Sequence, residues 1–295
     1  MAGLPPTSYF VTSALFHYLG PSLAVLLFVH LEPVGVAWLR ITAAAVLFAA
    51  WRRPWRVLAG ASRRQRWVLA GLGVVLAAMN TLFYLAIDRL PLSTVGAIEF
   101  LGVVALAAVG VRTQRNLVAL MLAAGGVLVL ADVRLGGAPL GFALALANCA
   151  GFMLYVVLGH RVANTPLERA GADQRDTPAA PTSGIDQLGA AMLIAAVAAT
   201  PFGIGAAAPA FTHPLWLIWG IGVGLCSSVI PYVTDQLAMA RLPRASFAVM
   251  LALLPATAAL IGLVVLAQVP TVGDVAGIGL VIAGLALHQR PPDAP

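Results

Sequence analysis

Two charged side chains lie inside apolar stretches of this chain, and their types could do chemistry together. Glu99 follows Leu92 by seven residues in one apolar run, and Arg40 lies at a comparable depth in an earlier run. A carboxyl group in apolar surroundings could carry a proton at neutral pH, or hold an amino group when it is ionised. The planar guanidinium fork of Arg40 suits a carboxylate. The pair could therefore bind the two ends of a small zwitterion.

Each of these residues also has a structural interpretation. At ~1.5 Å per residue, Glu99 lies about 10 Å inside its run, too deep for its short side chain to reach water. It could be a protonated carboxyl that is hydrogen-bonded within the core. Arg40 could instead extend toward the outer interface of a membrane beside Trp38, or pair with an acidic side chain. The residues alone leave these interpretations open.

Weaker candidates are polar groups in other apolar runs. Asp235 follows Pro231 by about one turn, near the end of its run, where a solvated position or a pair with Arg241 is the alternative. Pro231 should free a backbone carbonyl one turn earlier and kink its helix. Any one of the remaining groups could simply bond helix to helix, but together they predict a partly polar cavity: His17, Asn80, Tyr84, Asn148, Tyr155 and Tyr232.

The motifs of common catalytic and cofactor sites are absent. The chain has no H-E-x-x-H, no G-x-x-x-x-G-K-[ST], no G-x-S-x-G, and no G-x-G-x-x-G that leads from a strand to a helix. We therefore expect no enzyme, no cofactor and no metal site. Cys149 and Cys226 each lie in an apolar stretch, and two such residues predict packing instead of a disulfide framework or zinc cluster.

The composition indicates which elements must position these groups. Hydrophobic residues make up 61% and charged residues 9% of the 295 residues, whereas a soluble domain averages roughly 25% charged residues. A spanning helix needs ~20 apolar residues, so the chain predicts an all-α integral membrane protein with ten transmembrane helices. The runs are 9–29, 34–51, 67–87, 92–111, 117–131, 140–160, 185–204, 215–240, 245–267 and 272–288.

The arginines orient these runs. The formal charge is +6, and a basic balance could indicate nucleic acid, but the arginines lie in loops between apolar runs, as the positive-inside rule predicts. With both termini in the cytoplasm of a bacterium, only Arg89 and Arg134 lie outside. The cytoplasmic arginines are Arg52, Arg53, Arg56, Arg63, Arg64, Arg66, Arg112, Arg115, Arg161, Arg169, Arg175, Arg241, Arg244 and Arg290. We expect a multi-pass membrane protein whose partner is the lipid bilayer and not nucleic acid.

A repeated string predicts a duplication. Leu-Ala-Ile-Asp-Arg-Leu-Pro at 85–91 returns as Leu-Ala-Met-Ala-Arg-Leu-Pro at 237–243, and five runs separate the two copies. Because five is odd, the halves should have opposite orientations in the bilayer, which is the inverted repeat of alternating-access transporters. We expect five-helix repeats at 1–134 and 135–290, with a cytoplasmic connector at 162–184.

Several segments resemble one family of transporters. They are Ala37-Trp-Leu-Arg-Ile, Arg53-Pro-Trp-Arg, the string from Ala78 to Ile87 with the following Leu-Pro-Leu, Ala97-Ile-Glu-Phe-Leu-Gly, and Ile230-Pro-Tyr through Arg241-Leu-Pro. The chain resembles the EamA-type permeases of the drug/metabolite transporter superfamily, and among them the threonine/homoserine exporter branch. The resemblance implies secondary active export of amino acids by proton antiport across the bacterial inner membrane, so a small-molecule substrate and protons are the expected partners. It also implies cavity roles for Glu99, Arg40, Asn80, Tyr84 and Tyr232, while His17 and Asp235 stay weaker candidates.

The chain departs from the family pattern at three places. A Glu-Pro pair common in the ninth run is Leu254-Pro255 here, a Gly-Glu pair near its end is Ala267-Gln268, and the proline that usually follows the Glu99 string is Val103. Glu99 is therefore the lone deep carboxylate of its kind.

Other functions stay open at this point. A passive facilitator of small solutes, a non-transporting receptor or scaffold, and a membrane-embedded enzyme share the same composition, although the enzyme would need paired acids or a His-Asp arrangement near one interface. The sequence does not identify the solute, the coupling ion or the direction of transport, nor whether the chain forms a homodimer.

Overall fold

The computed structural model describes residues 6–110, 113–134, 138–164, 184–239 and 254–287. These residues form helices joined by short turns, and they contain no β-strand. The α-helices are α1 (Pro6–Leu27), α2 (Pro33–Arg52), α3 (Trp55–Gly60), α4 (Arg63–Ile87), α5 (Leu92–Gly110), α6 (Gln114–Arg134), α7 (Pro139–Asn164), α8 (Gly184–Ala207), α9 (Pro214–Gly224), α10 (Ile230–Met239), α12 (Leu254–Leu266) and α13 (Val272–Leu287). Two irregular helices are the 3-10 helix η1 (Ala208–Thr212) and the π-helix η2 (Leu225–Val229).

The prediction of an all-α integral membrane protein is confirmed. Five helices are long and apolar enough to cross a membrane, within the ranges 33–52, 63–87, 139–158, 184–212 and 214–234. Shorter apolar helices occupy parts of the other predicted runs, in α1, α5, α6, α12 and α13. The number of ten spans stays a prediction. Most of the predicted connector 162–184, and most of the second copy of the repeated string, lie outside the described residues.

Local sequence signals place several helix ends. Pro33 and Pro214 begin α2 and α9, where a missing N–H costs no helical hydrogen bond. The Ser62 hydroxyl accepts a hydrogen bond from the Gln65 N–H and caps α4. Arg53 ends α2 in the left-handed region, with φ 50°. The chain therefore turns into α3 directly after α2, inside the arginine-rich loop.

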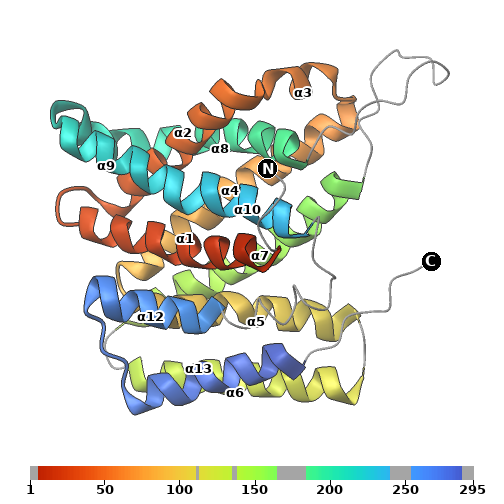
Figure 1. Ribbon diagram of the computed structural model, residues 1–295, viewed down its shortest axis with the longest axis vertical. Helices are drawn as coiled ribbons and strands as arrows, with labels where there is room; N and C mark the ends of the chain where they lie inside the picture. Colours follow the sequence, from red (N-terminus) through yellow and green to blue (C-terminus); the bar gives the residue numbers. More distant parts are fainter. Residues whose placement is uncertain (1–5, 111–112, 135–137, 165–183, 240–253, 288–295) are drawn as a thin grey trace.

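The helices pack in layers, as Figure 1 shows. Helices α5, α6, α12 and α13 lie together at one end of the bundle, and α2, α8 and α9 lie at the other. Helix α1 packs against both α10 and α12, so it connects the two groups. Helix α7 packs against both α4 and α5. Residues from α1, α2, α4, α5, α7 and α10 therefore share one buried core.

Tight packing of α9 on α2 depends on a glycine. A Cβ atom on Gly224 would lie 2.8 Å from the backbone oxygen of Arg40 and 2.7 Å from the Ala43 Cβ. We expect Gly224→Ala to destabilise the protein by about 1–3 kcal/mol, because the two helices would have to separate. Gly222→Ala is the matched control, since a Cβ there meets nothing within 4 Å. Thermal unfolding in detergent checks this, and equal midpoints for the two variants would contradict it.

Candidate functional site

All five main candidates are buried between the helices. Glu99 of α5 and Arg40 of α2 are 4% and 6% exposed, and both lie deep within their helices. Asn80 and Tyr84 of α4 and Tyr232 of α10 are also buried. The helix turns that carry them therefore face protein.

Arg40 is held by the π-helix η2. Its Nε donates to the Ser228 hydroxyl at 3.0 Å, and its Nη2 donates to the Ser227 carbonyl at 3.0 Å. The guanidinium carbon also lies 5.2 Å from the centre of the Tyr84 ring, within the range of a cation–π contact. We call Arg40, Tyr84, Ser227 and Ser228 the Arg40 cluster. It joins α2, α4 and the α9–η2–α10 segment.

Pro231 explains why the Ser227 carbonyl is free for Arg40. A proline has no N–H, so it cannot bond to the carbonyl four residues earlier in its helix. That carbonyl belongs to Ser227, and the helix widens into the π-turn at the same place, where the Ile230 N–H bonds to Leu225 O. The predicted release of a carbonyl one turn before Pro231 agrees with the hydrogen bond from Arg40 to the Ser227 carbonyl, and the predicted kink stays a prediction. Gly20 of α1 lies directly against the Ser227 side chain and backbone, because it has no Cβ.

Arg40 does not extend outward. Its side chain is buried, and the adjacent Trp38 Nε1 donates to the Thr200 hydroxyl at 3.0 Å. The interpretation in which Arg40 reaches the outer interface beside Trp38 is therefore wrong, because the released Ser227 carbonyl offers a partner inside the bundle. Among the described residues no carboxylate forms a salt bridge with Arg40.

Glu99 lies at the packing of α5 on α7. Its Oε1 accepts a hydrogen bond from Asn148 Nδ2 at 3.3 Å, and its backbone oxygen accepts one from Cys149 Sγ at 3.8 Å. Among the described residues neither Glu99 Oε2 nor Asn148 Oδ1 has a hydrogen-bond partner. A buried polar atom without a partner costs about 1–3 kcal/mol. Part of the hydrogen-bonding capacity of this pair is therefore unused.

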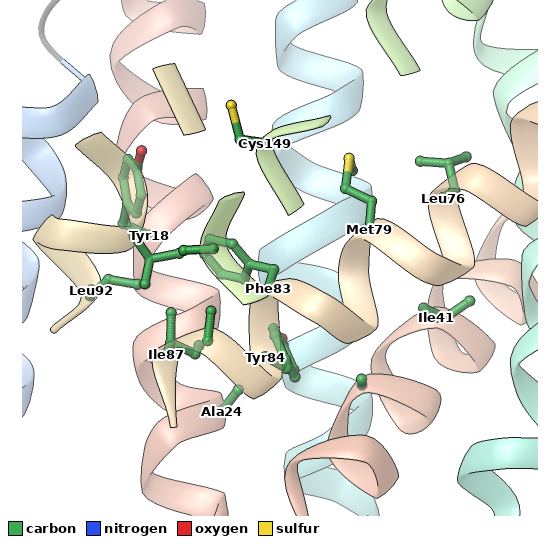
Figure 2. Packing of buried hydrophobic residues seen from close by; sticks show 14 of the residues in the cluster. Tyr18, Ala24, Ile41, Leu76, Met79, Phe83, Tyr84, Ile87, Leu92 and Cys149 are labelled. Atoms are coloured by element: carbon green, nitrogen blue, oxygen red, sulfur yellow. The ribbon is translucent and has the colours of Figure 1, made fainter. Parts of the chain in front are cut away.

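Tyr18 of α1 brings a third such oxygen to the same region. Its side chain is fully buried, and its hydroxyl has no hydrogen-bond partner in the described part of the chain. A Cβ on Gly96 would lie 3.0 Å from the Tyr18 Oη, and Gly96 precedes Glu99 by one turn of α5. Figure 2 shows Tyr18, Tyr84 and Cys149 among the buried residues of one cluster.

The other predicted residues are less closely tied to these two groups. Asn80 Nδ2 donates to Leu76 O within its own helix at 2.7 Å. The Tyr84 hydroxyl lies 3.5 Å from the Ser227 hydroxyl, so Tyr84 does join the Arg40 cluster. His17 is half-buried and its ring lies edge-on to that of Tyr18. The side chain of Asp235 lies outside the described part of the structure.

Sequence reasoning missed three residues of these groups. A tyrosine in an apolar run is ordinary, so Tyr18 gave no signal before the structure showed its unpaired hydroxyl. Ser227 could have been found, because it lies four residues before Pro231 and its carbonyl must seek another donor. Ser228 follows from Ser227 only when the position of Arg40 is known.

The fold is also found in a known structure. One solved structure, described as the crystal structure of a protein, matches with a TM-score of 0.55 and 19% sequence identity, over 95% of this chain and 96% of that one. At this identity the likeness concerns the fold alone. No protein-family model matches the chain.

Relatives of known name cover most of the chain. It is 32% identical over 267 residues to the threonine/homoserine exporter RhtA of Escherichia coli strain K12, across 90% of this chain and 84% of the relative. It is 31% identical over 284 residues to the threonine/homoserine exporter RhtA of Salmonella typhimurium strain LT2, across 92% and 88%. These relatives are named as exporters and not as enzymes. The chain therefore belongs to the family of threonine/homoserine exporters, within the EamA-type drug/metabolite transporters.

Proposed function

We propose that this chain is a secondary active transporter that exports small amino acids from the bacterial cytoplasm in exchange for protons. Threonine and homoserine are the first candidate substrates, because the relatives carry their names. The observation that carries the proposal is Glu99. In a chain of this exporter family, it is a buried carboxyl group with one oxygen held by Asn148 and the other without a partner among the described residues.

Glu99 could serve both ions of the exchange in turn. A buried carboxyl group is neutral when it carries a proton, and when it loses the proton it attracts a cation such as the ammonium of an amino acid. Proton and amino acid would then exclude each other at one site, which is the coupling that antiport requires. Arg40 could hold the substrate carboxylate with its Nη1 amino group, which neither of its hydrogen bonds to the serines uses.

Alternating access would come from two inverted five-helix repeats, residues 1–134 and 135–290. The packing of the helices supports this assignment. Helix α1, the first of one half, packs on α10 in the third span of the other, and α7, the first of the second half, packs on α4 in the third span of the first. The second, fourth and fifth helices pack against their counterparts, as α2 with α8, α5 with α12 and α6 with α13. This pattern is unchanged when the halves are exchanged.

We also propose that the protein lies in the inner membrane with both termini in the cytoplasm. The arginine-rich loop between α2 and α4 is flanked by Trp51, Trp55 and Trp67, which are all exposed, as interfacial aromatic side chains are. Arg52 at the end of α2 pairs with Asp186 at the start of α8, with Nε and Oδ1 2.6 Å apart. These features are consistent with a cytoplasmic position for the loop.

The proposal is tested with the wild-type protein in sealed liposomes. When the inside is made acidic, proton efflux should drive the uptake of radiolabelled threonine above its equilibrium level, and an uncoupler should abolish the excess. Uptake that stops at equilibrium and ignores the uncoupler would indicate a passive facilitator instead. Absence of flux for both threonine and homoserine would contradict the proposed substrates.

A further inference from the structure

Three buried oxygen atoms without a hydrogen-bond partner among the described residues lie along the turn of α5 from Gly96 to Glu99. They are Glu99 Oε2, Asn148 Oδ1 and the Tyr18 hydroxyl, which come from α5, α7 and α1. The three side chains are at most 4% exposed. Each atom can accept a hydrogen bond, and among the described residues none of the three has one.

The geometry fixes the role of Asn148 as an acceptor. Because its Nδ2 donates to Glu99 Oε1, its Oδ1 is the atom left for another partner. Cys149, the next residue along α7, donates to the Glu99 backbone oxygen at 3.8 Å. Two neighbouring residues of α7 therefore hold α5 at Glu99, and the Asn148 Oδ1 atom lies beside the Glu99 carboxyl.

Gly96 makes room for the Tyr18 hydroxyl beside Glu99. Residues three apart share a face of a helix, and side chains lean toward the helix N-terminus, so the Glu99 side chain leans toward the turn that holds Gly96. A Cβ at Gly96 would lie 3.0 Å from the Tyr18 Oη and 3.3 Å from the Ala258 Cβ. The absence of a side chain at Gly96 thus lets the phenol oxygen lie against this turn of α5, toward which Glu99 leans.

We propose that Glu99, Asn148 and Tyr18 form an ammonium subsite in which each contributes one oxygen acceptor to a primary amine. The subsite rests on the proposed export of amino acids. It adds acceptor roles for Asn148 and Tyr18 and a preference for primary over secondary amines. A primary ammonium has three N–H donors, which match three oxygens, and the Glu99 charge repels an anionic group. A secondary amine has one donor fewer and leaves one of these oxygens unpaired.

The subsite predicts selectivity that two substitutions relax. Purified wild-type protein should bind threonine about tenfold more tightly than N-methylthreonine, because one hydrogen bond to a charged group is lost. It should not measurably bind 2,3-dihydroxybutanoate, in which a hydroxyl replaces the ammonium. Tyr18→Phe and Asn148→Leu should each weaken threonine binding about tenfold and reduce the preference over N-methylthreonine. Tyr18→Phe removes a buried hydroxyl without a partner among the described residues, so its thermal stability should be at least that of the wild type.

Titration calorimetry measures binding, and liposome flux measures transport of the same solutes. Tyr9→Phe is the matched control, since it makes the same chemical change on α1 about 13 Å along the helix from Tyr18.

Unchanged affinity and selectivity in Tyr18→Phe and Asn148→Leu would overturn the subsite, while export would stand. If threonine binding required sodium and Tyr18→Phe changed that requirement, the subsite would also be overturned, in favour of a cation site. Selective binding without flux would contradict export and leave the subsite in place. No binding of threonine or homoserine by the wild type would contradict both.

Discussion

Replacing Glu99 with glutamine is expected to abolish threonine accumulation driven by a pH gradient. Glutamine has nearly the same shape, and its side-chain oxygen could still accept from Asn148 Nδ2, so the packing of α5 on α7 should persist. It cannot release a proton, so the exchange of a proton for an amino acid has no carrier. The loss of a charge-assisted hydrogen bond to the ammonium should also weaken threonine binding about 10–100-fold.

The matched control is Glu32→Gln. Glu32 is exposed in the turn before α2 and caps that helix without a side-chain hydrogen bond. The two variants are compared with the wild type in the same liposomes, with and without a pH gradient. If Glu99→Gln still accumulates threonine above equilibrium, then Glu99 does not carry the exchanged proton.

Replacing Arg40 with methionine is expected to destabilise the protein and to stop transport. The Ser227 carbonyl and Ser228 hydroxyl would lose a charged donor inside the bundle. The carbonyl cannot regain the α-helical partner four residues later, because Pro231 has no N–H. The expected cost is about 2–3 kcal/mol, visible as a lower midpoint of thermal unfolding in detergent. Arg89→Met is a suitable control, since Arg89 is about one-third exposed and its pair with Asp88 lies at the surface, where such a pair contributes little.

A second substitution separates the structural role of Arg40 from a role in binding. Pro231→Ala restores an N–H that can donate to the Ser227 carbonyl. The double variant Arg40→Met with Pro231→Ala should therefore recover part of the stability that Arg40→Met loses, and the cycle of variants measures this coupling. If Arg40 binds the substrate carboxylate, transport should not recover with stability. Full recovery of transport would show that Arg40 acts only by holding the π-turn.

The helices of this protein could largely be predicted from the sequence. The fourth run was expected to begin at Leu92, and α5 begins there. The run predicted for 215–240 corresponds to α9, η2 and α10 together. Long apolar runs bounded by arginines and prolines carry this information. Helix α3 was missed, because six residues in an arginine-rich loop show no apolar periodicity.

Two residues that depart from the family pattern have distinctive conformations or contacts in the structure. Ala267 stands where the family often has glycine, and it adopts φ 53°, a region that favours glycine. Gln268, in place of a common glutamate, accepts a hydrogen bond from the Leu92 N–H at 3.1 Å, so it holds the start of α5. The hydrogen bond between Leu92 and Gln268 joins residues 176 positions apart, and no local sequence pattern could predict it.

The site could be predicted only in part for the same reason. The charges at Glu99 and Arg40 are conspicuous in apolar runs, so burial was expected for Glu99 and was one of two open interpretations for Arg40, but their partners are set by how distant helices meet. Asn148 was expected only as one polar group of a partly polar cavity, and Tyr18 was not singled out at all. The unpaired oxygens that distinguish these residues become visible only when α1, α5 and α7 are packed together.

The most direct test of the shared proton and amino-acid site is proton release on binding. Threonine is added to purified protein in weakly buffered detergent solution, over a series of pH values from acidic to neutral, and the released protons are counted against the bound threonine. Release should approach one proton per threonine at the pH values where Glu99 is protonated, and Glu99→Gln should release none. Saturating binding of threonine to the wild type with no proton release at any pH would contradict the account.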